Sequence, residues 1–307
     1  MPARIVPKDA AGAETSEDWL RRMDEIGEDE GYFERLGGVH WSFFADHGTT
    51  LLVTFERLHD IRTGSPGQMP FGYGVAVPQG WSHLCLVAGQ DRWYRDPTVF
   101  RYFDRLVDDA FFEDFDRVVF YGAGMGGYAA AAFSVVAPGA TVILAAPQAT
   151  LDPLYAVWDP RFRSARRLNF TDRYGYAPDM TEGAGQVFVI HDPENAPDAA
   201  HAALFRRPFA TLLRTPGLGT DPHRMLAEMG ALDAVLLAAG QGGLSPAVFY
   251  RALRARHRHL PYLRMLLGRT DARGRDGLSA RVCRAVLRDH AAPRFRKRLA
   301  EIEGEAG

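Results

Sequence analysis

The chain has 307 residues, of which 47% are hydrophobic and 24% are charged, and its formal net charge is −2. These values fit an ordinary globular protein with a sizeable core, built as one large α/β domain or two small ones. Cys85 and Cys283 lie far apart with no CxxC pair, which supports neither a disulfide framework nor a cysteine-ligated zinc site. We expect both cysteines to be buried as small apolar residues.

No membrane segment is expected. The first residues contain no apolar run of the kind found in a secretory signal, and no stretch of about 18 uncharged apolar residues occurs. The sequence therefore predicts a cytoplasmic protein with no membrane partner.

The N-terminal region is predicted to contain a disordered segment and then a helix. Residues 1–14 are rich in alanine, proline and charged residues, and we expect them to be disordered. Thr15 or Ser16 can cap the following helix, predicted over 17–36, in which Trp19, Leu20, Met23 and Ile26 repeat at helical spacing. The first strong strand is predicted at 51–58, LLVTFERL, a continuous apolar run of the kind that a parallel sheet buries on both faces.

Strands and helices alternate through the rest of the core. This alternation predicts βα units in a mainly parallel sheet with helices on both faces. The further strands are expected at 75–78, 83–89, 117–122, 140–147, 186–192 and 209–217, and the helices at 100–115, 124–137 and 223–240.

The predicted core spans residues 15–243. Within it, residues 150–183 are rich in proline, arginine and aromatic residues, and we expect this cap-like insertion to overhang a ligand site.

Residues 244–307 are predicted to form a basic helical extension. This segment holds 15 basic and 6 acidic residues, whereas residues 1–50 hold 5 basic and 11 acidic ones. We expect two or three amphipathic helices whose solvated basic face pairs partly with the acidic N-terminal region, and which can also bind a protein partner. No nucleic-acid partner is expected, because the segment contains no known binding module.

The segment FYGAGMGGYAA at 120–130 carries the main functional signal, and it has two interpretations. A strand that turns sharply into a helix presents backbone N–H groups at the turn. Read as GxGxxG, Gly122, Gly124 and Gly127 match a dinucleotide-binding loop. The acidic residue expected about 20 positions later is missing, since that part of the chain reads LAAP.

Read as GxSxG, the same segment is Gly122, Ala123, Gly124, Met125 and Gly126. Here the chain resembles the α/β-hydrolase family, in particular members whose nucleophile elbow reads G-x-S-M-G-G-Y followed by small residues. The resemblance covers roughly residues 50–240. It implies an α/β-hydrolase-like fold in which Gly124 stands where the family carries its nucleophilic serine.

The resemblance also implies an acid and a base, because the family's chain order is nucleophile, acid, histidine. Asp192 ends the strand where the family places the acid, and His223 lies in a later loop where it places the base. Without a serine the usual mechanism cannot run. The Met125 N–H, which is half of the family's oxyanion hole, would survive together with the helix N-terminus, leaving a site for a carbonyl or an anion.

Three functions remain open at this point. The first is a pseudohydrolase that binds a ligand or a partner. The second is a hydrolase or lyase that uses His223 and Asp192 as a base without a covalent serine intermediate. The third is a nucleotide-binding protein. We expect no cofactor and no metal site, because His257 and His259 are only two residues apart and no HxxxH motif occurs.

Overall fold

An eight-stranded sheet forms the centre of the molecule in the computed structural model, which describes residues 7–305. The strand order is β1-β2-β4-β3-β5-β6-β7-β8. Only β2 runs antiparallel to its neighbours, β1 and β4, and all other neighbouring strands are parallel. The strands are β1 (Gly31–Leu36), β2 (His40–Ala45), β3 (Thr50–Arg57), β4 (Ser82–Ala88), β5 (Arg117–Ala123), β6 (Thr141–Ala145), β7 (Gln186–His191) and β8 (Ala210–Arg214).

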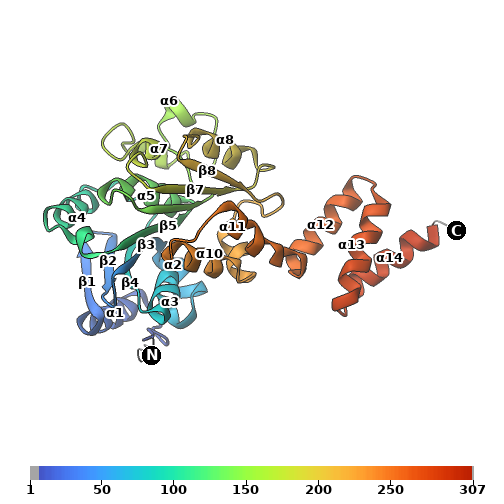
Figure 1. Cartoon of the computed structure of the whole chain (residues 1–307), viewed down its shortest axis with the longest axis horizontal. Helices are drawn as coiled ribbons and strands as arrows, with labels where there is room; N and C mark the ends of the chain where they lie inside the picture. Colours follow the sequence, from blue (N-terminus) through green and yellow to red (C-terminus); the bar gives the residue numbers. More distant parts are fainter. Residues whose placement is uncertain (1–6, 306–307) are drawn as a thin grey trace.

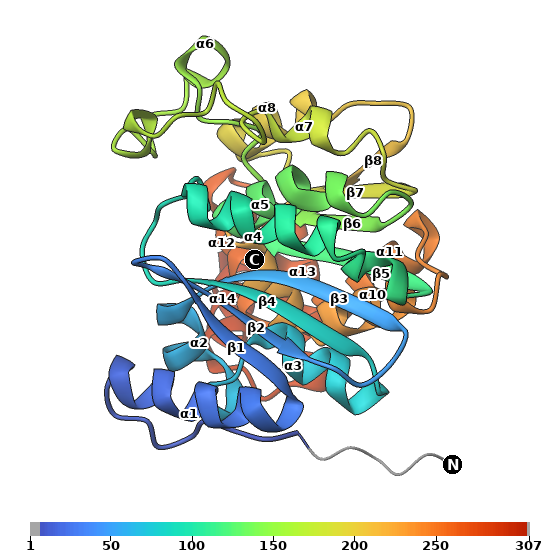
Figure 2. The same ribbon diagram turned by 90° about the vertical axis from the view of Figure 1, so that its left-hand side faces the viewer.

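Helices cover both faces of this sheet (Figures 1 and 2), which confirms the predicted fold class. Helices α4 and α5 pack on one face, and α1, α3 and α10 pack on the other. The α-helices are α1 (Ser16–Glu30), α2 (Leu58–Gly64), α3 (Phe71–Ala76), α4 (Pro97–Asp108), α5 (Met125–Phe133), α6 (Pro153–Ala156), α7 (Ala177–Met180), α8 (Ala196–Leu204), α9 (Pro222–Glu228), α10 (Ala231–Gly240), α11 (Pro246–Ala252), α12 (Leu260–Ala272), α13 (Asp276–Asp289) and α14 (Pro293–Glu305). None of the helices within residues 7–305 has both the length and the apolar character that a bilayer crossing requires.

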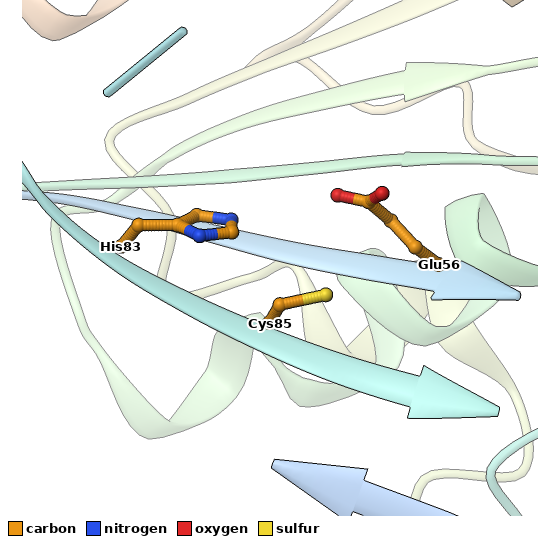
Figure 3. A group of neighbouring side chains, drawn as sticks. All are labelled: Glu56, His83 and Cys85. Atoms are coloured by element: carbon orange, nitrogen blue, oxygen red, sulfur yellow. The ribbon is translucent and has the colours of Figure 1, made fainter. Parts of the chain in front are cut away.

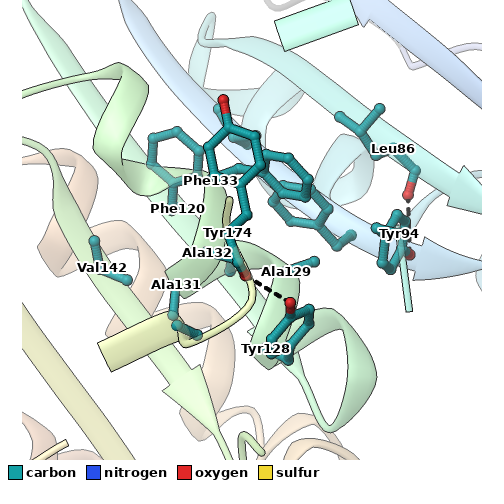
Figure 4. Close-up of a cluster of buried hydrophobic side chains, with 14 of the residues drawn as sticks. Leu86, Tyr94, Phe120, Tyr128, Ala129, Ala131, Ala132, Phe133, Val142 and Tyr174 are labelled. Atoms are coloured by element: carbon teal, nitrogen blue, oxygen red, sulfur yellow. Dashed lines mark hydrogen bonds between the residues drawn. The ribbon is translucent and has the colours of Figure 1, made fainter. Parts of the chain in front are cut away.

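Helix α5 packs unusually close to the sheet because its residues are small. The alanines at positions 129–132 are fully buried, and Phe133 stacks on Phe103 of α4. The buried Tyr128 and Tyr94 donate their hydroxyl hydrogens to main-chain oxygens (Figure 4). These bonds let the two tyrosines enter the core without leaving an unpaired polar group.

Two local predictions are wrong. Residues 75–78 are helical, in α3 and the turn after it, although their apolar run suggested a strand. The reason is tertiary, because the Glu56 carboxylate accepts hydrogen bonds from the first two N–H groups of α3. The predicted helix 223–240 is also broken into α9 and α10, at Gly230, whose φ of 65° lies in the left-handed region.

Strands β1 and β2, which extend the sheet on one edge, were not predicted, and residues 31–36, which form β1, were wrongly assigned to the N-terminal helix. Strand β1 is only half-buried and carries charged residues, so its apolar pattern is weak. By contrast, α1 begins where predicted, and Thr15 and Asp18 form a capping box at its start.

The described part of the N-terminal segment is packed, which corrects the prediction of disorder for residues 7–14. Ala10 and Ala13 are buried beside α1 and α3, and the Ala10 N–H donates to the Gly67 carbonyl at 2.8 Å. Residues 1–6 lie outside the described residues. The alanines that suggested disorder are small enough to pack beside these helices.

The predicted extension at 244–307 begins with α11, whose Phe249 packs in the core, and continues as α12 to α14, which project from the rest of the chain (Figure 1). Its ion pairs are formed within the extension or with the core, as in Arg298 with Asp271 and Arg269 with Glu194. Among the described residues, no arginine of α12 to α14 pairs with the acidic N-terminal region, which corrects that prediction. A protein partner for this extension stays a prediction.

Candidate functional site

The elbow predicted at Gly124 is a true strand-to-helix turn. Strand β5 ends at Ala123, α5 begins at Met125, and Gly124 between them has φ 53° and ψ −119°. Its N–H donates to the Ala145 carbonyl of the neighbouring strand at 2.9 Å. For a residue with a side chain this conformation would cost about 1–3 kcal/mol, and glycine removes most of that cost.

The positions of the elbow differ in why a glycine occupies them. A Cβ atom on Gly122 would lie 2.1 Å from the Gly126 carbonyl oxygen, and one on Gly126 would lie 2.2 Å from the Phe55 carbonyl oxygen. These two positions must be glycine because the main chains touch. A Cβ atom on Gly124 would meet no atom within 4 Å. Crowding therefore does not explain the missing side chain at Gly124.

The turn leaves hydrogen-bond donors at the start of α5. Gly124 supplies no side-chain cap, and the first N–H groups of any α-helix, here Met125, Gly126 and Gly127, have no partner within the helix. The positive end of the helix dipole lies at the same place. Gly124 at the tip of the turn is partly exposed, whereas Met125, Gly126 and Gly127 are buried. N–H groups at a helix N-terminus suit a carbonyl oxygen or an anion.

His223 lies near the elbow, in the first turn of α9. Its Nδ1 atom is 2.6 Å from the hydroxyl of Tyr121 on β5, and its ring lies against Tyr121 and edge-on to Phe71. Burial lowers the pKa of His223 below its usual 6.5, although Asp221 and Asp60 act in the opposite direction. The imidazole is therefore neutral at pH 7.

Asp192 follows β7 directly and is buried, but its carboxylate is already used. Oδ2 accepts the N–H groups of Gly217 and Gly219 at 2.9 and 2.8 Å, and Oδ1 accepts that of Glu194 at 2.9 Å. These bonds hold the loop after β8, where both glycines have positive φ. Between residues 7 and 305, no ion pair within 4.0 Å joins Asp192 to His223. The structure thus brings the implied acid and base to the same edge of the sheet without joining them.

A carboxylate that the sequence analysis did not single out lies at the end of β3. Glu56 accepts hydrogen bonds from the Phe71 N–H at 2.7 Å, the Gly72 N–H at 3.1 Å and the Thr54 hydroxyl at 2.7 Å. Burial raises its pKa, and these hydrogen bonds act in the opposite direction. A glutamate that interrupts the apolar run LLVTFERL was the available signal, because buried strands rarely carry one.

Two further reactive side chains lie beside Glu56 (Figure 3). His83 and Cys85 of β4 are fully buried, and one potential ligand atom from each of the three side chains lies within 4.8 Å of the others. The His83 Nε2 atom is 2.9 Å from the Thr54 hydroxyl oxygen. Burial lowers the pKa of His83 to about 3 and raises the pKa of the Cys85 thiol. This group has the donor types of a metal site.

Neither of two surface hollows adjoins the elbow. One, of about 320 Å³, lies between β1 and α4 and is lined by Tyr32 and Arg105. The other, of about 600 Å³, is lined by Arg254, His257 and His259 near the end of α9. The elbow therefore lies outside both of these hollows.

The sequence and the structure were compared with known proteins. No protein-family model and no curated protein matches the sequence. Solved structures do resemble it, at low identity. A capsule O-acetyltransferase of Neisseria meningitidis serogroup A is 11% identical, with 66% of this chain and 93% of that chain covered and a TM-score of 0.42. The carboxylesterase EstE1, cloned from a metagenomic library, is 14% identical, with 76% and 99% covered and a TM-score of 0.43.

A third similar structure is the glycosylation-associated Gap123 complex of Streptococcus agalactiae, at 14% identity. The match covers 67% of this chain and 46% of that chain, with a TM-score of 0.46. Likenesses of this strength say nothing about substrate or activity. The sheet order and the turn at Gly124 show the fold more directly: the chain has an α/β-hydrolase-like fold, with a glycine at the tip of its elbow.

Proposed function

We propose that this chain is a pseudohydrolase, an α/β-hydrolase-like protein without a nucleophile that binds a ligand with a carbonyl or anionic group at the elbow. The observation that carries the proposal is the conformation of Gly124, which keeps the sharp elbow turn although no side chain is presented there. The turn still presents the backbone N–H donors at the start of α5. Such donors bind a ligand without any covalent step.

The surroundings of His223 and Asp192 favour binding over catalysis by these two residues. A general base that is oriented by a carboxylate needs that carboxylate within about 2.6–3.2 Å, or one water away. Here the Nδ1 atom of His223 contacts Tyr121, and the Asp192 carboxylate accepts three main-chain N–H groups. Both side chains have structural partners, so a hydrolase or lyase that relies on them has less support.

The nucleotide-binding alternative is also less well supported. Strand β6, which follows the glycine loop and its helix, ends at Ala145, and the following residues are Ala146, Pro147 and Gln148. No carboxylate is present in this stretch to accept a ribose hydroxyl.

A first experiment tests whether the wild-type protein forms a covalent intermediate. Purified protein is incubated with a fluorophosphonate probe and, separately, with an activated acetate ester. We expect no labelling and no burst of product, because no hydroxyl occupies the elbow. We also expect the Gly124→Ser variant to stay without turnover, since its new hydroxyl would find no His–Asp pair. Sustained ester turnover by the wild type would overturn the proposal.

A second experiment tests the binding site with two simple probes, acetate and inorganic phosphate. In ¹H–¹⁵N spectra we expect the amide signals of Met125 and Gly126 to shift with saturation as either probe is added. The Gly124→Leu variant should lose this response, because its side chain projects over the donors. The matched control is Gly139→Leu, since Gly139 also has positive φ and open space but lies in a loop before β6. Equal responses of the two variants would contradict a site at the elbow.

A further inference from the structure

Four polar side chains lie on one face of two neighbouring strands, under helix α3. Thr54 of β3 pairs in register with Cys85 of β4. Glu56 and His83 each lie two positions from one of these residues, and side chains two apart in a strand point to the same side. Strand register therefore brings Glu56, His83 and Cys85 together from two separate parts of the chain.

Helix α3 covers this polar group. His83 and Cys85 have no exposed surface, and a Cβ atom on Gly72 of α3 would lie 2.3 Å from the His83 Nε2 atom. Only glycine fits at that position of the helix, so the α3 main chain closes directly over the imidazole. Glu56 lies at the edge of the group and is half-buried.

The hydrogen bonds within this group leave one of its buried polar atoms without a partner. The Nδ1 atom of His83 is buried and has no hydrogen-bond partner. Glu56 forms no ion pair within 4.0 Å in the part of the chain that the structure describes. A buried imidazole nitrogen without a partner is costly for a protein unless something pairs with it.

We propose that Glu56, His83 and Cys85 together bind one divalent metal ion of the zinc type. Thiolate, imidazole and carboxylate are the three ligand classes that Zn²⁺ takes in proteins. In a tetrahedral zinc site these atoms are about 3.3–3.6 Å apart, given metal–ligand distances of about 2.0–2.3 Å. The present group, within 4.8 Å, reaches that geometry by side-chain movements of about 1 Å.

Binding changes the protonation of the group. The metal replaces the proton of the Cys85 thiol, and that of Glu56 when the carboxyl is protonated, and the protons pass to the solvent. His83 stays neutral and donates the lone pair of one ring nitrogen. The Thr54 hydroxyl, which already contacts both Glu56 and His83, is placed to act as the fourth ligand or to orient the other ligands.

The metal would hold β3, β4 and α3 together. Glu56 also accepts the Phe71 N–H, and the Phe71 ring lies edge-on to His223 near the elbow. A metal bound to Glu56 would therefore stiffen one wall of the elbow region. The closed surroundings match a structural metal site and not a catalytic one, which keeps an open position. This inference does not depend on the elbow's proposed ligand.

The test uses the full chain without a histidine tag. It is purified without chelators and its metal content is measured by elemental analysis. The protein is then stripped with a chelator and titrated with Co²⁺. We expect about one equivalent of zinc per chain in the purified protein, and a thiolate-to-cobalt charge-transfer band that saturates at about one equivalent. The Cys85→Ser and His83→Gln variants should bind Co²⁺ more than about 100-fold more weakly, because loss of even an outer partner costs 10–100-fold.

The matched control is Cys283→Ser, since Cys283 is the other cysteine and is also buried. This variant should keep the band at full strength, which assigns the thiolate to Cys85 even if the Cys85→Ser protein fails to fold. The proposal is overturned if stripped wild-type protein shows no charge-transfer band with Co²⁺. It is equally overturned if the band persists in Cys85→Ser or disappears in a folded Cys283→Ser protein.

Discussion

Two regions at the carboxyl ends of the strands contain hydrogen-bonded carboxylates, and they differ in what surrounds each one. At the end of β7, the Asp192 carboxylate accepts only main-chain N–H groups, which fixes a loop. At the end of β3, the Glu56 carboxylate also accepts main-chain N–H groups, but it lies beside His83 and Cys85. The chain order indicated Asp192 as a residue of a functional site. The side chains around each carboxylate indicate Glu56 instead.

An aspartate at the position of a catalytic acid can thus have a purely structural role, which its hydrogen bonds define. The Asp192 carboxylate would stabilise the loop after β8 in an active hydrolase and in a pseudohydrolase alike. A reactive role requires other reactive groups within reach, and His223 and Asp192 on the elbow side of the sheet are not joined. Four predictions test this contrast.

The strongest effect is expected at Gly126, where the elbow helix touches the β3 strand next to Glu56. In Gly126→Ala the new Cβ would lie 2.2 Å from the Phe55 carbonyl oxygen, so main chain must move. We expect the free energy of unfolding to fall by about 3 kcal/mol or more, measured by urea denaturation. Gly124→Ala, with open space around it, should lose only about 1–3 kcal/mol from backbone strain. Equal losses would show that the two glycines have the same role.

The next effect concerns the structural role of Asp192. Asp192→Ala leaves three main-chain N–H groups without an acceptor, and we expect a loss of about 2–4 kcal/mol in the free energy of unfolding. The control is Asp152→Ala, which removes a helix cap that accepts one N–H group and should cost about 1 kcal/mol. A loss at Asp192 no larger than that of the control would mean that its carboxylate does not hold the loop.

The third prediction concerns pH and His223. Burial lowers the pKa of His223 in the folded protein, so the unfolded chain takes up a proton first as the pH falls through about 6.5. The stability that this residue contributes is present above pH 6.5 and is lost as the pH falls through its lowered folded pKa. Wild-type protein should therefore lose more stability on acidification from pH 7 than the His223→Gln variant, in urea denaturation at several pH values.

The exposed His257 provides the control for this pH experiment. The His257→Gln variant replaces a histidine whose side chain is exposed to solvent in the folded chain, so it reports the effect of the substitution itself at a place outside the core. A His223→Gln profile that coincides with the wild-type profile would show that His223 is not buried as described.

The smallest effect is expected from Tyr121→Phe, which removes the hydroxyl that contacts His223 at 2.6 Å. One lost hydrogen bond should cost about 0.5–1.5 kcal/mol in the free energy of unfolding. Tyr250→Phe, which removes an acceptor of the Arg214 N–H at a more exposed place, should cost less. If Tyr121→Phe increased ester turnover, the hydroxyl would be shown to restrain an active His223, in conflict with the pseudohydrolase proposal.

Much of the fold and part of the site could be predicted from the sequence. Continuous apolar runs indicated buried parallel strands, and the spacing of glycines at 122, 124 and 126 indicated the elbow. These are local patterns, in which neighbouring residues decide the outcome. The place of Asp192 at the end of β7 follows in the same way.

Which side chains meet could not be predicted in this way. Cys85 belongs to no metal-binding motif in the sequence, because its neighbours Thr54 and Glu56 lie about 30 positions earlier and reach it through the β3–β4 register. The three N–H partners of Asp192 and the contact of His223 with Tyr121 are likewise set by packing across strands. The apolar runs and the spacing of the glycines were therefore enough to predict the elbow and the class of fold. The identity of each side chain's partner came from the tertiary structure, because it depends on strand order and register, which no short pattern encodes.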